Sequence, residues 1–236
     1  VIEMLSENVH VIAIDAPGHG KSLFYNITKK IVFFSDVGEL IIDTLQKIGI
    51  EKFYLYGYSM GGRIAQNICI NYSSRIKSLI LESSSFGIFD EIERQKRYEM
   101  DLSLLKDVYS HSDFYNFLRK WHGLPMFASL NYSDIMYLIS AKMENNLDEL
   151  KQAIKILSCG NHPFFADLLK DINVPILYLY GEDDEKYTEI GIATNKIIPS
   201  IKIMQFNNAS HNIHIQFPEK IVALINHEIH EIHEKR

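Results

Sequence analysis

Apolar residues occur along this chain in short, nearly continuous runs, separated by stretches in which they recur at every third or fourth position. Such runs are typical of strands that are buried on both faces of a parallel sheet. Strands that alternate with helices predict an α/β fold with right-handed crossovers. The predicted strands are residues 9–15, 53–56, 78–81, 174–180 and 201–206.

Helical spacing fills the stretches between these runs. Ser35 and Asp36 can cap a helix whose apolar residues continue to Ile48, and Gly49 is placed to end it. Pro218 is placed to open a last helix. Residues 1–6 resemble the end of a helix, and further helices are expected to about residue 72 and to about residue 197.

The pattern changes between residues 83 and 170, where no buried strand is evident. This stretch consists of helix-like segments rich in charge and aromatic residues. An all-helical insertion between the strands of an α/β sheet is best interpreted as a lid over the strand ends. We therefore predict a core formed by residues 1–82 and 171–236, with a helical lid at 83–170.

Composition narrows the classes of function. The chain has 236 residues with a net charge of −6 and no dense run of Lys or Arg, which argues against nucleic acid as a partner. Cys69 and Cys159 are widely spaced and form no C-x-x-C motif, so neither a disulfide framework nor a zinc site is predicted. No signal peptide and no membrane-spanning apolar run are evident, so we predict a cytoplasmic location without a membrane partner. The oligomeric state is left open.

Residues 57–61 read Gly-Tyr-Ser-Met-Gly and match the G-x-S-x-G motif. A predicted strand precedes the motif and a helical pattern follows it, which is the context of a nucleophile elbow. Ser59 would then stand exposed above the sheet at a helix N-terminus, where free amides favour an anion. The alternative is a glycine-rich turn with an incidental serine.

Three candidate groups follow successive strands: Ser59, an acid within residues 182–184, and His211. Ligands and catalytic groups gather at the carboxyl ends of strands in open α/β sheets. The order Ser, Asp, His is that of the α/β-hydrolases. The sequence therefore predicts a catalytic triad.

Two members of this triad have competitors nearby. We favour Asp184 as the orienting acid, with Asp183 and Glu182 as alternatives. We favour His211 as the base over His214, which comes after the loop turns towards the last helix. A metal held by these two histidines would need further ligands that the sequence does not offer, so no metal is predicted.

Arg63 lies four residues beyond Ser59, one helical turn along the same face. A guanidinium at this place would point towards whatever occupies the serine and could bind a carboxylate through two parallel hydrogen bonds. The alternative is a surface salt bridge.

Several segments resemble one family of menaquinone-pathway lyases on the α/β-hydrolase fold, the 2-succinyl-6-hydroxy-2,4-cyclohexadiene-1-carboxylate synthases. The resemblance covers essentially the whole chain. It implies that the Ser59–His211 pair removes a proton from the substrate ring, that no acyl-enzyme forms, and that pyruvate is expelled without a metal or organic cofactor. The segments that carry it are residues 57–63, 15–20, 93–98, 121–130, 181–187 and 210–214.

The resemblance also implies roles for further residues around an anionic small-molecule substrate. The Met60 amide would stabilise a developing oxyanion. Arg63 and Arg97 would bind the substrate, and Tyr58 and Trp121 would line its pocket. Lys142 stands where the family has a third arginine. Lysine keeps the positive charge of arginine but lacks its planar guanidinium fork.

The front of the chain departs from the family pattern. The family begins with earlier strands and a His-Gly loop that supplies a second oxyanion-hole amide, and no such loop precedes residues 9–15. We interpret the sequence as a fragment of a longer chain. Two other functions are kept as alternatives: a serine esterase or thioesterase on the same fold, and a non-catalytic remnant.

Overall fold

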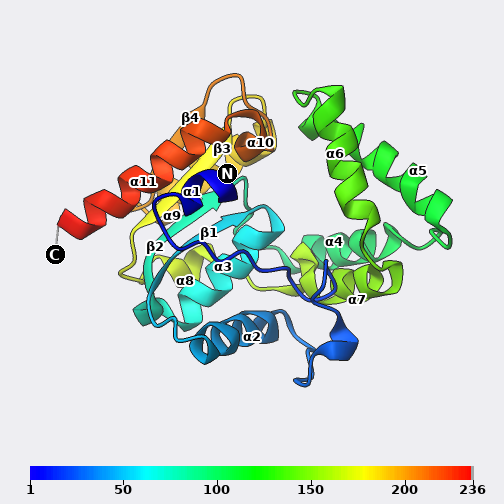
Figure 1. The fold of residues 1–236 in the computed structure, drawn as a ribbon, viewed down its shortest axis with the longest axis horizontal. Coiled ribbons are helices and arrows are strands. Elements are labelled where there is room, and N and C mark those ends of the chain that lie inside the picture. Colours follow the sequence, from blue (N-terminus) through cyan, green and yellow to red (C-terminus); the bar gives the residue numbers. More distant parts are fainter. Residues whose placement is uncertain (235–236) are drawn as a thin grey trace.

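A four-stranded parallel sheet forms the centre of the part of the chain that the structure describes, with the strands in the order β1-β2-β3-β4 (Figure 1). The computed structural model describes residues 1–234, the side chain of His233 excepted. Four of the five predicted strands are thereby confirmed, and so is the α/β class. The strands are β1 (Phe53–Tyr58), β2 (Ile76–Glu82), β3 (Ile176–Gly181) and β4 (Lys202–Phe206).

Helices cover both faces of this sheet (Figure 1). Successive residues of β2 and β3 alternate between two apolar clusters: Leu79 and Tyr178 pack into one, Ile80 and Leu177 into the other. Burial on both faces explains why these strands read as continuous apolar runs. The first cluster contains side chains of α2 (Phe34–Lys47), α3 (Met60–Asn71), α8 (Ala166–Leu169) and α9 (Glu185–Ile197), and the second those of α1 (Ile2–Ser6), α10 (Ile213–Gln216) and α11 (Pro218–Glu234).

The strand predicted at residues 9–15 is wrong. This segment contains no strand, and Ile12 and Ile14 are 36% and 43% exposed. A strand needs a neighbour to complete its backbone hydrogen bonds, and among the described strands β1 pairs only with β2. An apolar run indicates that the side chains favour burial, but it does not indicate whether a neighbouring strand is present to pair with the segment.

Helix α2 begins slightly earlier than the sequence pattern predicts. Its first residue is Phe34, and the Asp36 carboxylate lies in the first turn, where it accepts hydrogen bonds from the amides of Val32 and Phe33, both at 2.8 Å. The predicted end is confirmed, since Gly49 adopts a φ of 80° just beyond the helix.

The insertion between β2 and β3, all of which the structure describes, consists of helices and connecting turns and contains no strand, as predicted. Two of its helices, α5 and α6, stand away from the sheet (Figure 1). Leu105, Phe114 and Ile139 belong to a separate apolar cluster within the insertion, whereas α8 packs against the sheet. The division at residues 83–170 stays a prediction, and we call this stretch the lid. Its longer helices are α4 (Glu91–Ser103), α5 (His111–His122), α6 (Tyr132–Met143) and α7 (Leu147–Leu157).

Short 3₁₀ turns connect several elements: η1 (Phe24–Asn26), η2 (Ser73–Arg75), η3 (Pro125–Phe127) and η4 (Cys159–Asn161). Within residues 1–234, no helix combines the length and the apolar character needed to cross a membrane.

Candidate active site

Ser59 occupies a strained turn between β1 and α3. Its backbone has φ 48° and ψ −109°, a conformation that residues other than glycine rarely adopt. The Ser59 amide donates a hydrogen bond of 2.9 Å to the carbonyl of Glu82 at the end of β2, which ties the turn to the sheet. The strand–turn–helix context that the G-x-S-x-G motif requires is therefore present.

Glycines make this turn possible because backbone from two elements meets there. A Cβ on Gly57 would lie 2.6 Å from the Gly61 carbonyl oxygen, and one on Gly62 would lie 2.4 Å from Ser84 Oγ. A Cβ on Gly61 would have no heavy atom within 4 Å apart from its chain neighbours and the backbone of its own helix. The two adjacent glycines of α3 therefore differ in what they tolerate.

We expect Gly62→Ala to lower the free energy of unfolding by about 1–3 kcal/mol, because overpacking forces neighbouring atoms to shift. Gly61→Ala is the matched control and should be neutral, or stabilising by up to about 1 kcal/mol, because alanine favours the helix. Urea unfolding of both variants checks the difference. Equal loss of stability in the two would contradict it.

The structure brings the predicted serine, histidine and aspartate into one hydrogen-bonded chain. His211 Nε2 lies 3.1 Å from Ser59 Oγ, and His211 Nδ1 lies 2.7 Å from Asp184 Oδ2. His211 and Asp184 are only 1% and 5% exposed. A neutral His211 whose Nδ1–H donates to the carboxylate leaves Nε2 free to accept a proton from the serine.

The competing residues point elsewhere. Glu182 and Asp183 are exposed, and the Glu182 carboxylate accepts a hydrogen bond from the Asn208 amide. His214 Nδ1 lies 2.8 Å from Glu82 Oε1, so this imidazole is paired with a different carboxylate. The geometry favours Asp184 and His211.

Aromatic rings surround the His211 imidazole. The ring centroid of Tyr58 lies 5.2 Å from it, that of Tyr187 4.7 Å, and that of Phe127 6.3 Å in an edge-on arrangement. Burial, followed by the nearby Glu82 and other groups, raises the pKa of Tyr58 well above its usual value, so Tyr58 stays neutral. The sequence analysis missed Tyr187 and Phe127. Both residues lie in segments that carry the family resemblance, residues 121–130 and 181–187, but neither was assigned a role.

Met60 is the first residue of α3. Amides in the first turn of a helix have no acceptor within the helix, so the Met60 N–H is free to donate to an oxyanion beside Ser59. The position agrees with the role predicted for Met60.

Arg63 is buried and does not form a surface salt bridge. Its side chain donates from Nη1 to the Leu157 carbonyl at 2.7 Å and lies over the Phe34 ring at 5.9 Å. Burial lowers the pKa of the Arg63 guanidinium. No carboxylate of the described residues lies within salt-bridge distance of Arg63. A buried cation without an acid is costly on its own and is suited to an anionic ligand.

Arg97 is engaged with an acid inside the lid. Its Nε donates to Asp101 Oδ1 at 2.8 Å, and the second oxygen of the buried Asp101 accepts from Ser158 Oγ at 2.7 Å. Lys186, on α9, lies near Arg97: partial desolvation of its ammonium and then the charge of Arg97 lower the pKa of Lys186. The sequence analysis missed Lys186, although it lies only two residues beyond Asp184.

The structure shows no contact of Lys142 or Trp121 with Arg63 or Arg97 among the described residues. Lys142 Nζ lies 3.1 Å from Nε2 of His122, which the structure buries, and burial lowers the pKa of Lys142 to about 8. The Trp121 ring stacks on Phe117 of the same helix at 6.0 Å. The substrate-binding roles of these two residues stay predictions.

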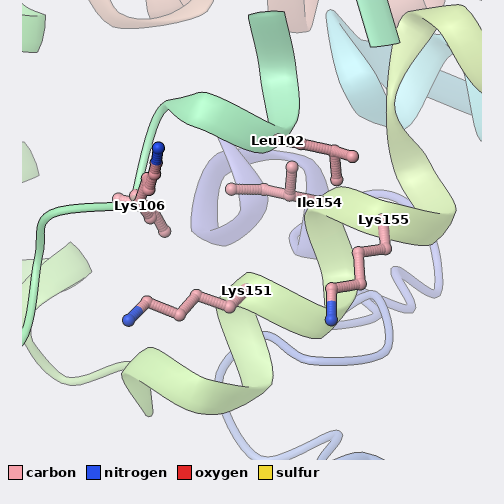
Figure 2. Close-up of a pocket in the computed structure, with 6 residues that line it drawn as sticks. Leu102, Lys106, Lys151, Ile154 and Lys155 are labelled. Carbon is pink, nitrogen blue, oxygen red and sulfur yellow. The ribbon is translucent and has the colours of Figure 1, made fainter. Parts of the chain in front are cut away.

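Two surface cavities lie away from the triad. One lies in the lid between α7 and the end of α4, where three lysines and the apolar Leu102 and Ile154 line it (Figure 2). The other lies between residues 14–28 and α2. Among the described residues, no three His, Cys, Asp or Glu side chains gather in a way that could hold a metal ion. The lysines of the first cavity are Lys106, Lys151 and Lys155.

The chain is similar over most of its length to proteins that share one name. It is 31% identical over 215 residues to the 2-succinyl-6-hydroxy-2,4-cyclohexadiene-1-carboxylate synthase of Enterobacter sp. (strain 638), which covers 90% of this chain and 78% of that protein. It is 29% identical over 215 residues to the protein of the same name from Yersinia enterocolitica, which covers 91% and 75%. The solved structure of MenH from S. aureus superposes with a TM-score of 0.88 at 30% identity, which covers 98% of this chain and 87% of that one.

A family model described as the alpha/beta hydrolase fold matches residues 1–218. Ser59, Asp184 and His211 follow one another along the chain in the order that the triad residues of that fold have. The chain thus belongs to the α/β-hydrolase fold family. Within it, the chain is a member of the 2-succinyl-6-hydroxy-2,4-cyclohexadiene-1-carboxylate synthases.

Proposed function

We propose that the chain eliminates pyruvate from 2-succinyl-5-enolpyruvyl-6-hydroxy-3-cyclohexene-1-carboxylate and forms 2-succinyl-6-hydroxy-2,4-cyclohexadiene-1-carboxylate, a step of menaquinone biosynthesis. A proton leaves the ring, a ring carbon–oxygen bond breaks and a carbon–carbon double bond forms. The expelled enolate takes up a proton and becomes pyruvate. The proposal includes a cytoplasmic location and no metal or organic cofactor.

Proton removal is assigned to the Ser59–His211 pair. His211 Nε2, 3.1 Å from Ser59 Oγ, takes the serine proton while the serine oxygen takes the proton of the ring. Asp184 holds the imidazole in the required tautomer and stabilises its charged form. The Met60 amide donates to the oxygen on which negative charge develops.

The observation that carries the proposal is the buried Arg63 beside a complete triad. The Arg63 amide donates to the Ser59 carbonyl at 3.3 Å, so this cation stands one helical turn from the serine. A substrate with several carboxylates supplies the missing negative charge. Arg97 and Lys142 are proposed as further cationic contacts, with Tyr58 and Trp121 lining the pocket.

A serine hydrolase would use the same triad differently, by forming an acyl-enzyme on Ser59. Pyruvate release from the ring substrate, followed through lactate dehydrogenase, tests the lyase. Turnover of p-nitrophenyl acetate, with intact-protein mass spectrometry for an acyl adduct, tests the hydrolase. Pyruvate release without an adduct is expected. Ester turnover with an adduct, and no pyruvate, would reverse the assignment.

Lys142 gives the proposed binding a pH dependence. With its pKa lowered to about 8 by burial, Lys142 is an ammonium below that pH and neutral above it. If it contacts a substrate carboxylate, KM should rise between about pH 7 and about pH 9 as the charge is lost. Lys142→Arg keeps its charge and should flatten KM over this interval. An equal rise of KM in both proteins would assign the pH dependence to another group.

A further inference from the structure

Glu82 lies at the carboxyl end of β2, and its side chain is completely buried. Its backbone carbonyl accepts the 2.9 Å hydrogen bond from the Ser59 amide. One residue therefore fixes the backbone of the strained turn that carries the serine. The Glu82 side chain is linked in turn to the segment that carries His211, the other member of the Ser59–His211 dyad.

The Glu82 carboxylate holds the segment that follows His211. Its Oε1 accepts hydrogen bonds from the His214 amide at 3.2 Å and from His214 Nδ1 at 2.8 Å. Its other oxygen accepts a close hydrogen bond from the Tyr56 hydroxyl. His214 stands three residues beyond His211, in the short helix α10, so the carboxylate anchors the end of the His211 loop to the sheet.

Tyr58 lies between the two histidines. Its ring centroid is 4.7 Å from the His214 imidazole and 5.2 Å from the His211 imidazole. A displacement of His214 is therefore transmitted to His211 through a packed ring as well as through the chain. A buried carboxylate is expensive unless its partners are well placed, and here every partner belongs to a segment that carries Ser59 or His211.

We propose that Glu82, through His214, is a positioning residue that holds His211 Nε2 within hydrogen-bond reach of Ser59 Oγ. It touches neither the substrate nor the reacting atoms. The Glu82 carbonyl fixes the position of the Ser59 backbone, and the Glu82 carboxylate fixes the position of the His211 imidazole through His214. One residue therefore determines the distance between His211 Nε2 and Ser59 Oγ. The requirement is for hydrogen-bond geometry and not for negative charge.

The effect on kcat rests on the proposed function, whereas the effect on serine reactivity does not. A fluorophosphonate reacts covalently with a serine that a histidine activates, and it needs no ring substrate. The rate of Ser59 labelling therefore reports the dyad directly. If the wild type labels Ser59 but releases no pyruvate, the proposed function fails while the role of Glu82 is still tested.

The variants are Glu82→Leu, Glu82→Gln, His214→Ala and the double change Glu82→Leu with His214→Ala. Each of the Leu and Ala changes should slow labelling and lower kcat by about 10- to 100-fold, because small displacements of reacting groups cost this much. KM should stay within about twofold, since no substrate contact is lost. Glu82→Gln should restore most of both rates, because its amide oxygen still accepts from His214 and its NH₂ can donate to Tyr56. The double variant should be no slower than the slower single variant.

The matched control is Glu189→Leu, an exposed glutamate on α9, which should keep wild-type labelling and kcat. His214 is partly exposed, so His214→Ala provides the test even where Glu82→Leu does not fold. Wild-type labelling rates in folded Glu82→Leu or His214→Ala protein, or additive losses in the double variant, would overturn the proposal. Loss of thermal stability with unchanged labelling would make Glu82 merely structural.

Discussion

Replacing Ser59 by alanine is expected to lower kcat for pyruvate release by about 10³-fold, within the range of a positioned acid–base group. The Ser59 oxygen is the atom that meets the substrate proton, and His211 Nε2 cannot reach the same place from the far side of that hydroxyl. KM should change little, because the carboxylate contacts remain. Steady-state kinetics with coupled detection of pyruvate measures both constants.

Ser133→Ala is the matched control for the loss of one hydroxyl, because Ser133 is exposed on α6 and bonds only locally to Asn131. It should keep wild-type kinetics. Ser59→Ala should remain folded, because alanine meets the same backbone strain as serine. A Ser59→Ala protein that releases pyruvate at the wild-type rate would remove the serine from the mechanism.

Replacing Arg63 by methionine is expected to lower kcat/KM by about 100-fold, the equivalent of the roughly 2–3 kcal/mol of one charge-assisted hydrogen bond lost in a dry site. The kcat/KM of Arg63→Lys should lie between those of the wild type and Arg63→Met, because lysine keeps the charge without the planar fork. The protein should not lose stability in proportion. Methionine removes a buried cation that has no carboxylate partner among the described residues, so the desolvation cost of that charge is removed with it.

Measuring activity and thermal unfolding together distinguishes a binding role of Arg63 from a structural role. The matched control is Arg119→Met, because Arg119 is exposed on α5, and it should leave both quantities unchanged. A fall of kcat/KM that is matched by a comparable fall in the free energy of unfolding would mean that Arg63 is structural. Unchanged kcat/KM in Arg63→Met would mean that Arg63 does not bind a substrate carboxylate.

The sheet could be predicted from the sequence wherever a strand is buried on both faces. Residues 78–81 carried that signal and lie in β2, and residues 174–180 carried it and overlap β3. Residues 9–15 carried the same signal and form no strand, because hydrogen-bonded partners come from other parts of the fold and leave no mark on a local pattern. Ends fixed by a positive φ, such as that at Gly49, could be predicted closely.

The candidate site divides in a similar way. Ser59, Asp184 and His211 could be predicted because each directly follows a strand, and strand ends meet at one edge of a parallel sheet. Glu82 also ends a strand, but a lone glutamate has no motif, and its role depends on which histidine it faces. Lys142 and Trp121 lie on lid helices, where residue type alone does not say what the side chain contacts.

The hydrogen bond from Arg63 to Leu157 joins a helix of the sheet layer to the last residue of a lid helix. Any movement that draws α7 away from α3 removes the carbonyl that orients this guanidinium. Affinity for an anion and lid position are therefore linked quantities: an anion that binds more tightly with α7 in place favours that arrangement by the same factor. If α7 moves away, the Arg63 guanidinium loses the carbonyl that orients it, and we expect a bound anion to dissociate more readily from that arrangement.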